Sequence, residues 1–340
     1  MLIQRVTRTA RREGLQMTKT NRFEPFLASV GGSRRRFLVT LGAVGALALR
    51  PRQLEAEDEG VVGLARRSAI DADIVTHPVS ERVVMLEGSG GNITVVAGRD
   101  ATILVDAGFP VSRARILAAV QRHSTAPITH VVNTHWHFDH TDGNAWLHDS
   151  GAVIVGHART HQHMSTSTHV QGWRHTFPPA PEAARPGLVV GDLHKLDANG
   201  VAVLLRHYPP GHTDSDLSVH LIDSNVLVTG DTWWNGHYPF IDYSTGGSID
   251  GAITAAETNL AAADERTRVV PGHGPVGSRG DLREFRDMLL HARDAVGALK
   301  KQGRSLEEVV AARPLARYDA TWGGFLVPSP MFVGLVYQGC

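Results

Sequence analysis

Short apolar runs alternate with glycine-rich turns over most of the chain after about residue 79. The runs ERVVMLEG, NITVVAG and TILVDAG lie between residues 81 and 108, and their spacing predicts an antiparallel meander. Later runs repeat this style in VAVLLRHYPPGHT, DLSVHLID, NVLVTGDT and TRVVPGHG. Apolar side chains recur at helical spacing in residues 111–123, 248–263 and 281–302. Strands with interspersed helices in two comparable halves predict two sheets packed face to face with helices outside.

One polar cluster interrupts this pattern directly after an apolar run. The run PITHVVNT, residues 127–134, is rich in β-branched residues and predicts a buried strand. The stretch HWHFDH follows it, so we expect its polar side chains on the loop that leaves the strand. His135, His137 and Asp139 are two positions apart, a spacing that puts side chains on one side of an extended segment. His140 breaks this alternation and requires a turn, which the following Thr-Asp-Gly supplies.

The cluster predicts a metal site, because imidazole and carboxylate groups at this density suit a zinc-like divalent ion. Three further candidates each end an apolar run beside a glycine: His212 in PPGHTDSD, Asp231 in NVLVTGD and His273 in VVPGHGP. The only cysteine, Cys340, is the last residue, so no intramolecular disulfide is possible and the ligands are nitrogen and oxygen. The alternatives are a polar loop with coincidental histidines and simple turn roles for the three later residues.

These motifs resemble those of the metallo-β-lactamase superfamily over about residues 80–275. The resemblance rests on LVDAG at 104–108, HWHFDH at 135–140, GHT at 211–213, GDT at 230–232 and GHG at 272–274. It implies an α+β fold, the four-layer αββα sandwich of that family. It also implies two Zn2+ ions per chain.

The resemblance also implies a role for each candidate residue. The implied ligands of the first zinc are His135, His137 and His212, and those of the second are Asp139, His140 and His273. Asp231 would bridge the two ions, and Asp106 would orient a ligand. A hydroxide shared by the two ions would attack the carbonyl of an ester, lactone or amide, including a β-lactam. Asp139 would be catalytic, because it would orient this nucleophile and move its proton.

The resemblance implies a dinuclear zinc hydrolase. The positions where this sequence departs from the family pattern narrow the range of expected substrates. Asp231 stands where many true β-lactamases have Cys or Ser, so the site is more similar to those of lactonases. Several β-lactamases carry a Lys shortly after this position to grip the substrate carboxylate, where this chain reads Trp-Trp-Asn. The nearby aromatic residues are expected either to wall an apolar substrate pocket or to belong to the core: Tyr208, Trp233, Trp234, Tyr238 and Phe240. The alternative function is a non-hydrolytic metal-binding or di-iron redox protein with the same ligands.

A second histidine-rich segment spans residues 157–169. His157 and His161 are at helical spacing, which is compatible with another metal site. A solvated helix or lid is the favoured interpretation.

The charge of the chain is unevenly distributed although its formal net charge is zero. Residues 1–48 hold nine Lys and Arg against two Asp and Glu, so the remainder carries about seven more acidic than basic residues. An acidic remainder argues against nucleic acid as a partner, because phosphate binding requires a basic face. The expected partner is a small-molecule substrate.

The basic start of the chain resembles a twin-arginine export signal. In GSRRRFLVTLGAVGALALRP, residues 32–51, three arginines precede an apolar stretch that is too short to span a bilayer. The small residues Ala46, Leu47 and Ala48 suit a cleavage site. We expect a signal region at 1–48, a linker at 49–78 and a hydrolase domain with a C-terminal helical extension at 79–340. This signal implies export machinery as a partner, a periplasmic or secreted location and no stable membrane anchor. A basic tail beside an unrelated apolar segment is the alternative.

Overall fold

Two sheets lie face to face in the computed structural model of the chain, which describes residues 60–198 and 200–340. In spatial order, the first sheet contains β1 (Val75–Ser80), β2 (Val83–Glu87), β3 (Ile93–Ala97), β4 (Thr102–Val105), β5 (Ile128–Val132), β6 (Val153–His157) and β9 (Leu188–Val190). The second contains β10 (Leu193–Ala198), β11 (Val201–His207), β12 (Leu217–Leu221), β13 (Val226–Trp234) and β14 (Arg268–His273). A separate hairpin pairs β7 (Thr168–Val170) with β8 (His175–Phe177).

Side chains on the strands alternate between two buried faces. On β2, Val83 and Met85 join the hydrophobic cluster between the sheets. Val84 and Leu86 join the cluster on the outer face of the first sheet. The period of two along a strand therefore explains why this run is apolar throughout, since both of its faces are covered.

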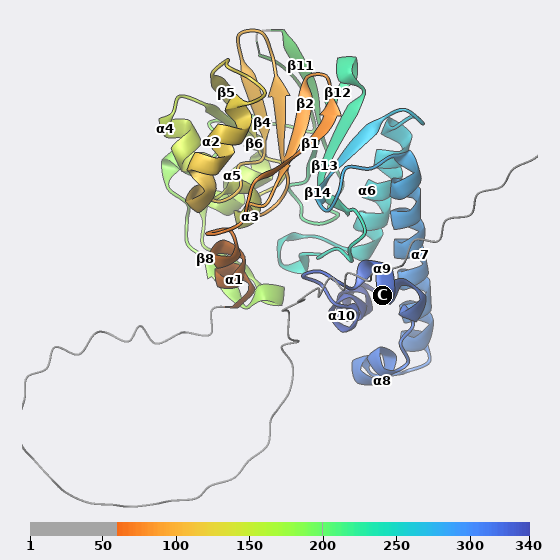
Figure 1. Cartoon of the computed structure of the whole chain (residues 1–340). Helices are drawn as coiled ribbons and strands as arrows, with labels where there is room; N and C mark the ends of the chain where they lie inside the picture. Colours follow the sequence, from red (N-terminus) through yellow and green to blue (C-terminus); the bar gives the residue numbers. More distant parts are fainter. Residues whose placement is uncertain (1–59, 199) are drawn as a thin grey trace, which may run out of the picture. The chain divides into compact units, whose positions relative to one another are not determined.

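Helices cover the outer face of each sheet (Figure 1). The helices α2 (Arg113–Gln121) and α4 (Asn144–Asp149) share a hydrophobic cluster with the first sheet. The helices α6 (Ile249–Ala262) and α7 (Arg279–Lys301) share another with the second sheet. This helix–sheet–sheet–helix order confirms the predicted four-layer αββα sandwich.

The start of α7, the longest of these helices, is determined by a local sequence motif. The Ser278 hydroxyl accepts a hydrogen bond from the backbone N–H of Asp281, and the Asp281 carboxylate accepts one from the backbone N–H of Ser278. This capping box satisfies backbone donors at the start of α7. Leu282, Phe285 and Leu289 then recur at helical spacing and are buried against the second sheet and α6.

The direction of the strands places several strand ends at one edge of the two sheets. The strands β2, β3 and β4 form the predicted antiparallel meander. By contrast, β4, β5, β6 and β9 are parallel neighbours, and β13 is parallel to β14. The loops that follow the parallel strands therefore leave from the same edge, which is where the candidate ligands lie.

The start of the described chain departs from the expected plan, whereas its C-terminal extension is helical. The predicted linker contains α1 (Gly60–Ser68) and the start of β1, and α1 buries Val62 in a cluster with Phe109 and Phe138. This part of the segment therefore belongs to the domain, while the predicted signal region lies outside the described residues. The C-terminal extension forms α8 (Leu306–Ala311), α9 (Ala316–Trp322) and α10 (Ser329–Gly339). No helix within residues 60–198 and 200–340 is both long enough and apolar enough to cross a membrane.

Candidate metal centre

The structure brings together all of the candidate ligands, which come from five separate places in the chain. His135 and His137 lie on the segment after β5, and Asp139 and His140 lie in the single turn α3 (Phe138–Thr141). The other three lie in the β11–β12 loop, in β13 and at the end of β14: His212, Asp231 and His273. Their ligand atoms form two groups, within each of which all atoms lie no more than 4.8 Å apart.

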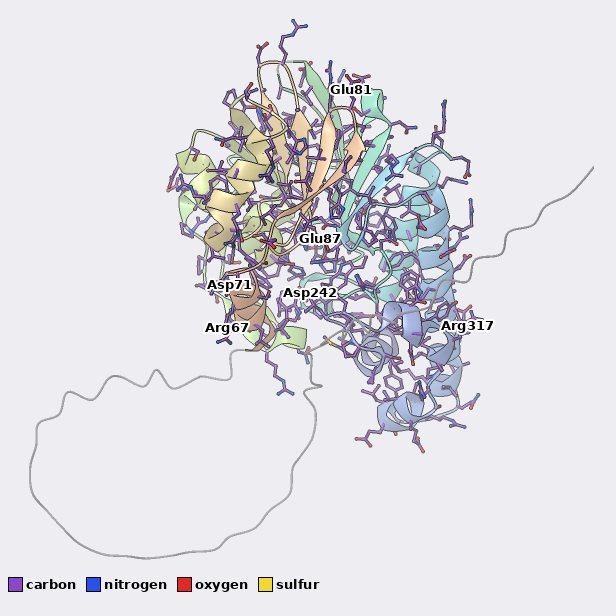
Figure 2. All side chains as sticks on the ribbon, viewed as in Figure 1. Arg67, Asp71, Glu81, Glu87, Asp242 and Arg317 are labelled. Atoms are coloured by element: carbon purple, nitrogen blue, oxygen red, sulfur yellow. The ribbon has the colours of Figure 1, made fainter. Side chains whose placement is uncertain are left out.

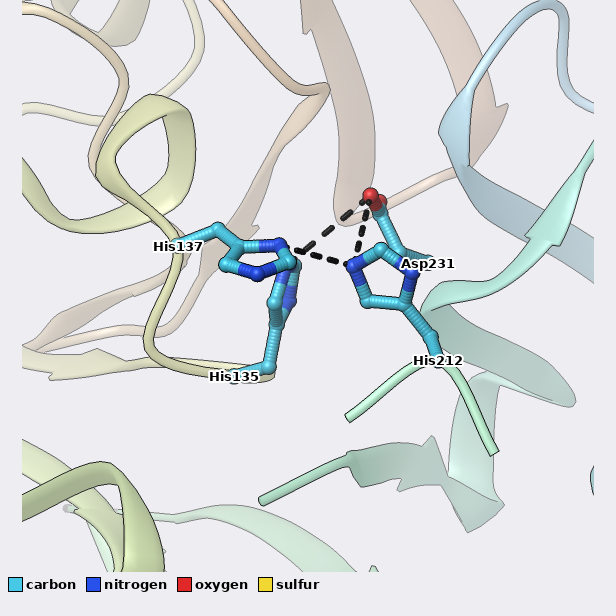
Figure 3. A group of neighbouring side chains, drawn as sticks. All are labelled: His135, His137, His212 and Asp231. Atoms are coloured by element: carbon cyan, nitrogen blue, oxygen red, sulfur yellow. Dashed lines mark hydrogen bonds and ion pairs between the residues drawn. The ribbon is translucent and has the colours of Figure 1, made fainter. Parts of the chain in front are cut away.

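The first group consists of His135, His137, His212 and Asp231 (Figure 3). His212 Nε2 lies 2.8 Å from His137 Nδ1, and it lies 3.4 Å from Asp231 Oδ2. His135 Nε2 lies 3.9 Å from the same carboxylate oxygen. Three imidazole nitrogens and one carboxylate therefore face a common point, as in a zinc site with nitrogen and oxygen ligands.

The second group consists of Asp139, His140 and His273. Asp139 Oδ2 lies 3.3 Å from His273 Nε2 and 3.6 Å from His140 Nε2. Asp231 lies beside this group as well, with Oδ1 3.2 Å from His140 Nε2 and Oδ2 3.5 Å from His273 Nε2. Its carboxylate thus approaches histidines of both groups.

Three buried polar atoms at this centre make no hydrogen bond within the described residues: His135 Nε2, His140 Nε2 and Asp231 Oδ1. Such atoms are costly to bury unless something binds them. Two imidazole nitrogens and a carboxylate oxygen that converge without a hydrogen bond are what a metal ion would satisfy. The residues present therefore fit a metal-binding centre.

Side chains and carbonyls behind the ligands hold the imidazole rings. His140 Nδ1 donates to Asp106 Oδ2 over 2.8 Å, which is where an orienting carboxylate would lie. His212 Nδ1 donates to the backbone carbonyl of Phe240 over 2.7 Å, leaving Nε2 directed at the centre. Asp106 itself has φ 66°, and it accepts from the backbone N–H of Thr134.

Asp242 is a supporting residue that the sequence interpretation missed. Its Oδ2 lies 3.1 Å from His137 Nε2, the ring nitrogen opposite the one that faces His212. The same carboxylate accepts hydrogen bonds from Ser244 N and Thr245 Oγ1, which fix its position. The only local signal for it is a lone acidic residue in the apolar stretch YPFIDY.

The charges of the centre favour a bound cation. Burial acts most strongly on the Asp231 carboxyl and raises its pKa, but His273 and His140 outweigh burial and hold the pKa well below its usual range. Burial lowers the pKa of His140, yet Asp231 and Asp139 outweigh it and raise the pKa well above its ordinary value. The carboxylates therefore attract positive charge to this point, and a metal ion would replace the proton that His140 otherwise binds.

Two glycines allow this close packing. A Cβ on Gly272 would lie 1.9 Å from Asp231 Oδ1, and a Cβ on Gly91 would lie 2.1 Å from His140 Cε1. Any side chain at either position would displace the ligand beside it. Gly272, the first glycine of GHG, is therefore required because its backbone lies so close to the Asp231 carboxylate, and not only because the chain turns there.

The aromatic residues proposed for a substrate pocket are buried in the hydrophobic core. Trp233, Trp234 and Tyr238 belong to the cluster between the second sheet and its helices, and the Tyr238 ring stacks on Phe332 of α10. Tyr208 is also buried, and its hydroxyl donates to Asn259 of α6. The structure therefore favours the core interpretation of these side chains. The cavity beside the candidate metal centre is lined by other residues.

The second histidine-rich segment forms α5 (Ala158–Ser165), and its histidines do not act together. His161 faces Ser165, whereas the His157 ring stacks on His207, with centroids 3.8 Å apart and Asp192 nearby. His157 Nδ1 accepts from the backbone N–H of Arg159. Burial, followed by the effect of His207, lowers the pKa of His157 to about 4. The ligand atoms of His157, His207 and the exposed Asp192 lie within 4.8 Å of one another, and His161 does not belong to this group.

Comparisons with known proteins agree with this geometry. A family model described as "Metallo-beta-lactamase superfamily" matches residues 86–292, more than half of the chain. The metallo-beta-lactamase domain-containing protein 1 of Xenopus laevis is 28% identical over 199 residues, which cover 54% of this chain and 71% of that protein. The acyl-coenzyme A thioesterase MBLAC2 of Bos taurus is 24% identical over 212 residues, which cover 55% of this chain and 74% of that protein.

Among solved structures, the chain is similar to the stereoselective inverting sec-alkylsulfatase Pisa1 from Pseudomonas sp.. The TM-score is 0.59 at 16% sequence identity, and the match covers 81% of this chain. This chain spans about half of the sulfatase, since the match covers 54% of it. The likeness shows a shared fold.

Proposed function

We propose that this chain, which belongs to the metallo-β-lactamase superfamily, is a dinuclear zinc hydrolase that cleaves an ester, lactone or amide bond. The observation that carries the proposal is the position of Asp231, whose carboxylate approaches histidines of both groups. A carboxylate in this position is suited to bridge two ions. His135, His137 and His212 would hold one zinc, and the other would be held by Asp139, His140 and His273.

Zinc, when bound, supplies an activated water and a Lewis acid that polarises the substrate carbonyl. The chain supplies the positioning and the proton transfer. Asp139 lines a cavity beside the centre, and its side chain remains partly accessible while the histidines around it are buried. It can therefore accept a proton from the attacking water and return it to the leaving group. Asp106 and Asp242 hold the rings of His140 and His137 through their outer nitrogens.

Carboxylic esters and lactones are the substrates that we favour over β-lactams. Asn235, which stands close to the position of a carboxylate-binding Lys in several β-lactamases, donates its amide N–H to the carbonyl of Pro275. Asn235 therefore stabilises a turn and provides no positive charge that could bind a substrate carboxylate. The name of the Bos taurus relative, an acyl-coenzyme A thioesterase, supports hydrolysis at an acyl carbonyl.

Export by the twin-arginine route is a further part of this proposal. Arg34, Arg35 and Arg36 precede the apolar stretch, and this route carries proteins that have already folded. A metal centre assembled from five places in the chain depends on the folded state, so loading before export would suit it.

The test is an activity panel on zinc-loaded protein, with β-lactams, acyl lactones, carboxylic esters and thioesters side by side. We expect ester or lactone hydrolysis with at most weak β-lactamase activity. Asp231→Ala should lose at least about 100-fold in kcat/KM together with bound zinc, since even residues behind the ligands contribute about 10- to 100-fold. Asp223→Ala, a substitution at an exposed acidic residue, is the matched control and should change neither.

Two outcomes would contradict the proposal. Protein that retains two zinc ions and hydrolyses no member of the panel would not be a hydrolase of this type. Protein that binds two iron atoms with reversible redox chemistry, and shows no hydrolysis, would favour the alternative of a di-iron redox protein.

A further inference from the structure

A cavity of about 340 Å³ opens directly onto the second group of ligands. Asp139 and His273 form part of its wall, so a molecule inside it would touch the candidate reacting centre. Its volume lies at the lower end of the range of about 300–1,000 Å³ that ligand pockets occupy. The cavity is therefore suited to part of a small substrate.

The C-terminal segment supplies one wall of this cavity. Phe325 and Leu326 lie between α9 and α10, and they line the cavity while remaining 42% and 48% exposed. The Phe325 ring stacks on His237 with centroids 4.5 Å apart, and it lies 5.7 Å from the ring of His273. These two apolar side chains lie beyond residue 292, where the family match ends. They are thus a feature of this chain's own extension.

The opposite wall is also largely apolar. It comes from α1, which contributes Ala65 and Ser68, and from Ala72 and Phe109. Because α1 and the Phe325 segment both flank the cavity, an apolar group between them would lose much of its exposure to water.

One acidic residue of the cavity lining, Glu87, is not a candidate metal ligand. The lining contains no Lys or Arg, and its two acidic residues are Glu87 and Asp139. Glu87, labelled in Figure 2, ends β2, and its Oε2 lies 2.7 Å from His77 Nε2. A negatively charged substituent beside Glu87 would therefore be repelled by this carboxylate, since the lining offers no Lys or Arg to balance it.

We propose that this cavity binds an uncharged apolar alkyl or aryl group of the substrate, and that Phe325 and Leu326 determine its selectivity. This inference rests on the proposed hydrolase and names its substrate class, a neutral ester or lactone with an apolar substituent. Glu87 acts against anionic substrates by repulsion. Phe325 and Leu326 act through binding of the substituent and take no part in bond cleavage.

The test compares p-nitrophenyl acetate, p-nitrophenyl octanoate and the mono-p-nitrophenyl ester of octanedioic acid, which has the same chain length with a terminal carboxylate. Zinc-loaded wild type should prefer the octanoate to the carboxylated ester by about ten-fold or more in kcat/KM. Phe325→Ala and Leu326→Ala should each lower the ratio of octanoate to acetate kcat/KM about ten-fold, through a higher KM for the octanoate. Glu87→Gln should raise activity on the carboxylated ester relative to the octanoate, and more so at low ionic strength.

Leu193→Ala is the matched control, because Leu193 is an exposed leucine on β10 that does not line the cavity. It should leave the preference for the octanoate unchanged. Ester hydrolysis that is indifferent to chain length and terminal charge would overturn the inference while leaving the hydrolase proposal intact. Loss of the preference in Leu193→Ala as well would also contradict it, since the effect would then not be local.

A binding measurement separates this inference from failure of the hydrolase proposal. If no ester is hydrolysed, octanamide and the monoamide of octanedioic acid are titrated into the zinc-loaded protein by calorimetry. Tighter binding of octanamide, weakened about ten-fold by Phe325→Ala, would support the apolar cavity without catalysis. Equal binding of the two amides, or binding unaffected by Phe325→Ala, would contradict it.

Discussion

At the scale of single residues, Asp242 makes the contribution that is easiest to isolate. It contacts His137 through Nε2, while Nδ1 of the same ring faces His212. Asp242→Asn should weaken binding of one zinc by about 10- to 100-fold, because the amide cannot orient the ring and increase its basicity as the carboxylate does. Competitive titration against a chelator measures this loss.

Asp250→Asn is the control for this substitution. Asp250 is an exposed carboxylate on α6 that pairs with Arg293, away from the candidate ligands. It should bind zinc like the wild type. Unchanged affinity in folded Asp242→Asn would show that Asp242 serves only the local turn it forms with Ser244 and Thr245.

The sequence motifs identified the candidate ligands because each follows an apolar run and stands beside a recognisable neighbour. The strand β13 nevertheless continues past Asp231 to Trp234. HWHFDH follows β5, Asp231 lies in β13, and His273 ends β14. Asp242 could not be found this way, because its role depends on a contact with His137 across 105 positions of sequence. Trp233 shows the converse problem, since its side chain is buried in the core although it lies close to Asp231 in the sequence.

At the scale of the elements, β13 and β14 approach so closely that the space beside Asp231 admits only glycine. Gly272→Ala would place a Cβ 1.9 Å from Asp231 Oδ1 and 2.8 Å from the backbone carbon of Gly230. Because backbone cannot yield easily there, the carboxylate must move. We expect about 100-fold lower kcat/KM and reduced zinc content, measured by steady-state assay and metal analysis.

Gly187→Ala provides the comparison for Gly272→Ala. A Cβ on Gly187, just before β9, would meet no atom within 4 Å. Activity and zinc content should be retained in this variant. Full activity in Gly272→Ala would mean that the two strands separate freely, contrary to the packing described here.

The N-terminus of α5 carries a pH-dependent contribution to stability. Burial, followed by the effect of His207, lowers the folded-state pKa of His157 from 6.5 to about 4, and the smaller opposing effects of Asp192 and Asp214 do not offset this. Between these pH values the unfolded chain binds a proton here that the folded chain does not. The free energy of unfolding should therefore fall at this site as the pH falls through this interval.

His157→Asn removes the titrating ring and keeps a side-chain acceptor for the helix N-terminus. In urea unfolding at about pH 7.5 and about pH 5, the variant should lose less stability on acidification than the wild type. The variant and the wild type have the same metal centre, so any loss of zinc at the lower pH lowers the stability of both. Equal losses would contradict the low pKa of His157.

Elements with strong periodicity were predictable, and short ones were not. The meander of β2 to β4 is predicted by short apolar runs separated by glycine-rich turns. The helix α7 is predicted by apolar side chains at helical spacing. The three-residue strands β7, β8 and β9 offer too few positions for any period. The helix α1 is exposed at most of its positions and buries only Val62, and its packing against Phe138 depends on tertiary contact.

At the scale of the whole molecule, the region matched by the family model and the C-terminal extension contribute differently to function. Residues 86–292 contain the candidate ligands, whereas Phe325 and Leu326 in the extension line the adjoining cavity. The sequence predicted a helical extension, but its position over the centre could not be inferred from composition. That placement depends on burial of Phe332 and Val336 of α10 in the cluster with α6 and α7.

Export should depend on the arginine pair at the start of the chain. Changing Arg34 and Arg35 together to Lys should leave folded, metal-loaded protein in the cytoplasm, because the signal is read through this pair. Cell fractionation with zinc analysis of each fraction measures this. Changing Arg11 and Arg12 to Lys is the control and should leave export intact. Unchanged delivery of the Arg34 and Arg35 variant would refute the assignment.

The most direct test of the central claim is anomalous X-ray scattering at the zinc edge from crystals of the zinc-loaded protein. The account predicts two peaks, one among His135, His137 and His212 and one among Asp139, His140 and His273, with the Asp231 carboxylate in contact with both. A single peak, peaks away from Asp231, or scattering from iron alone in active protein would contradict it.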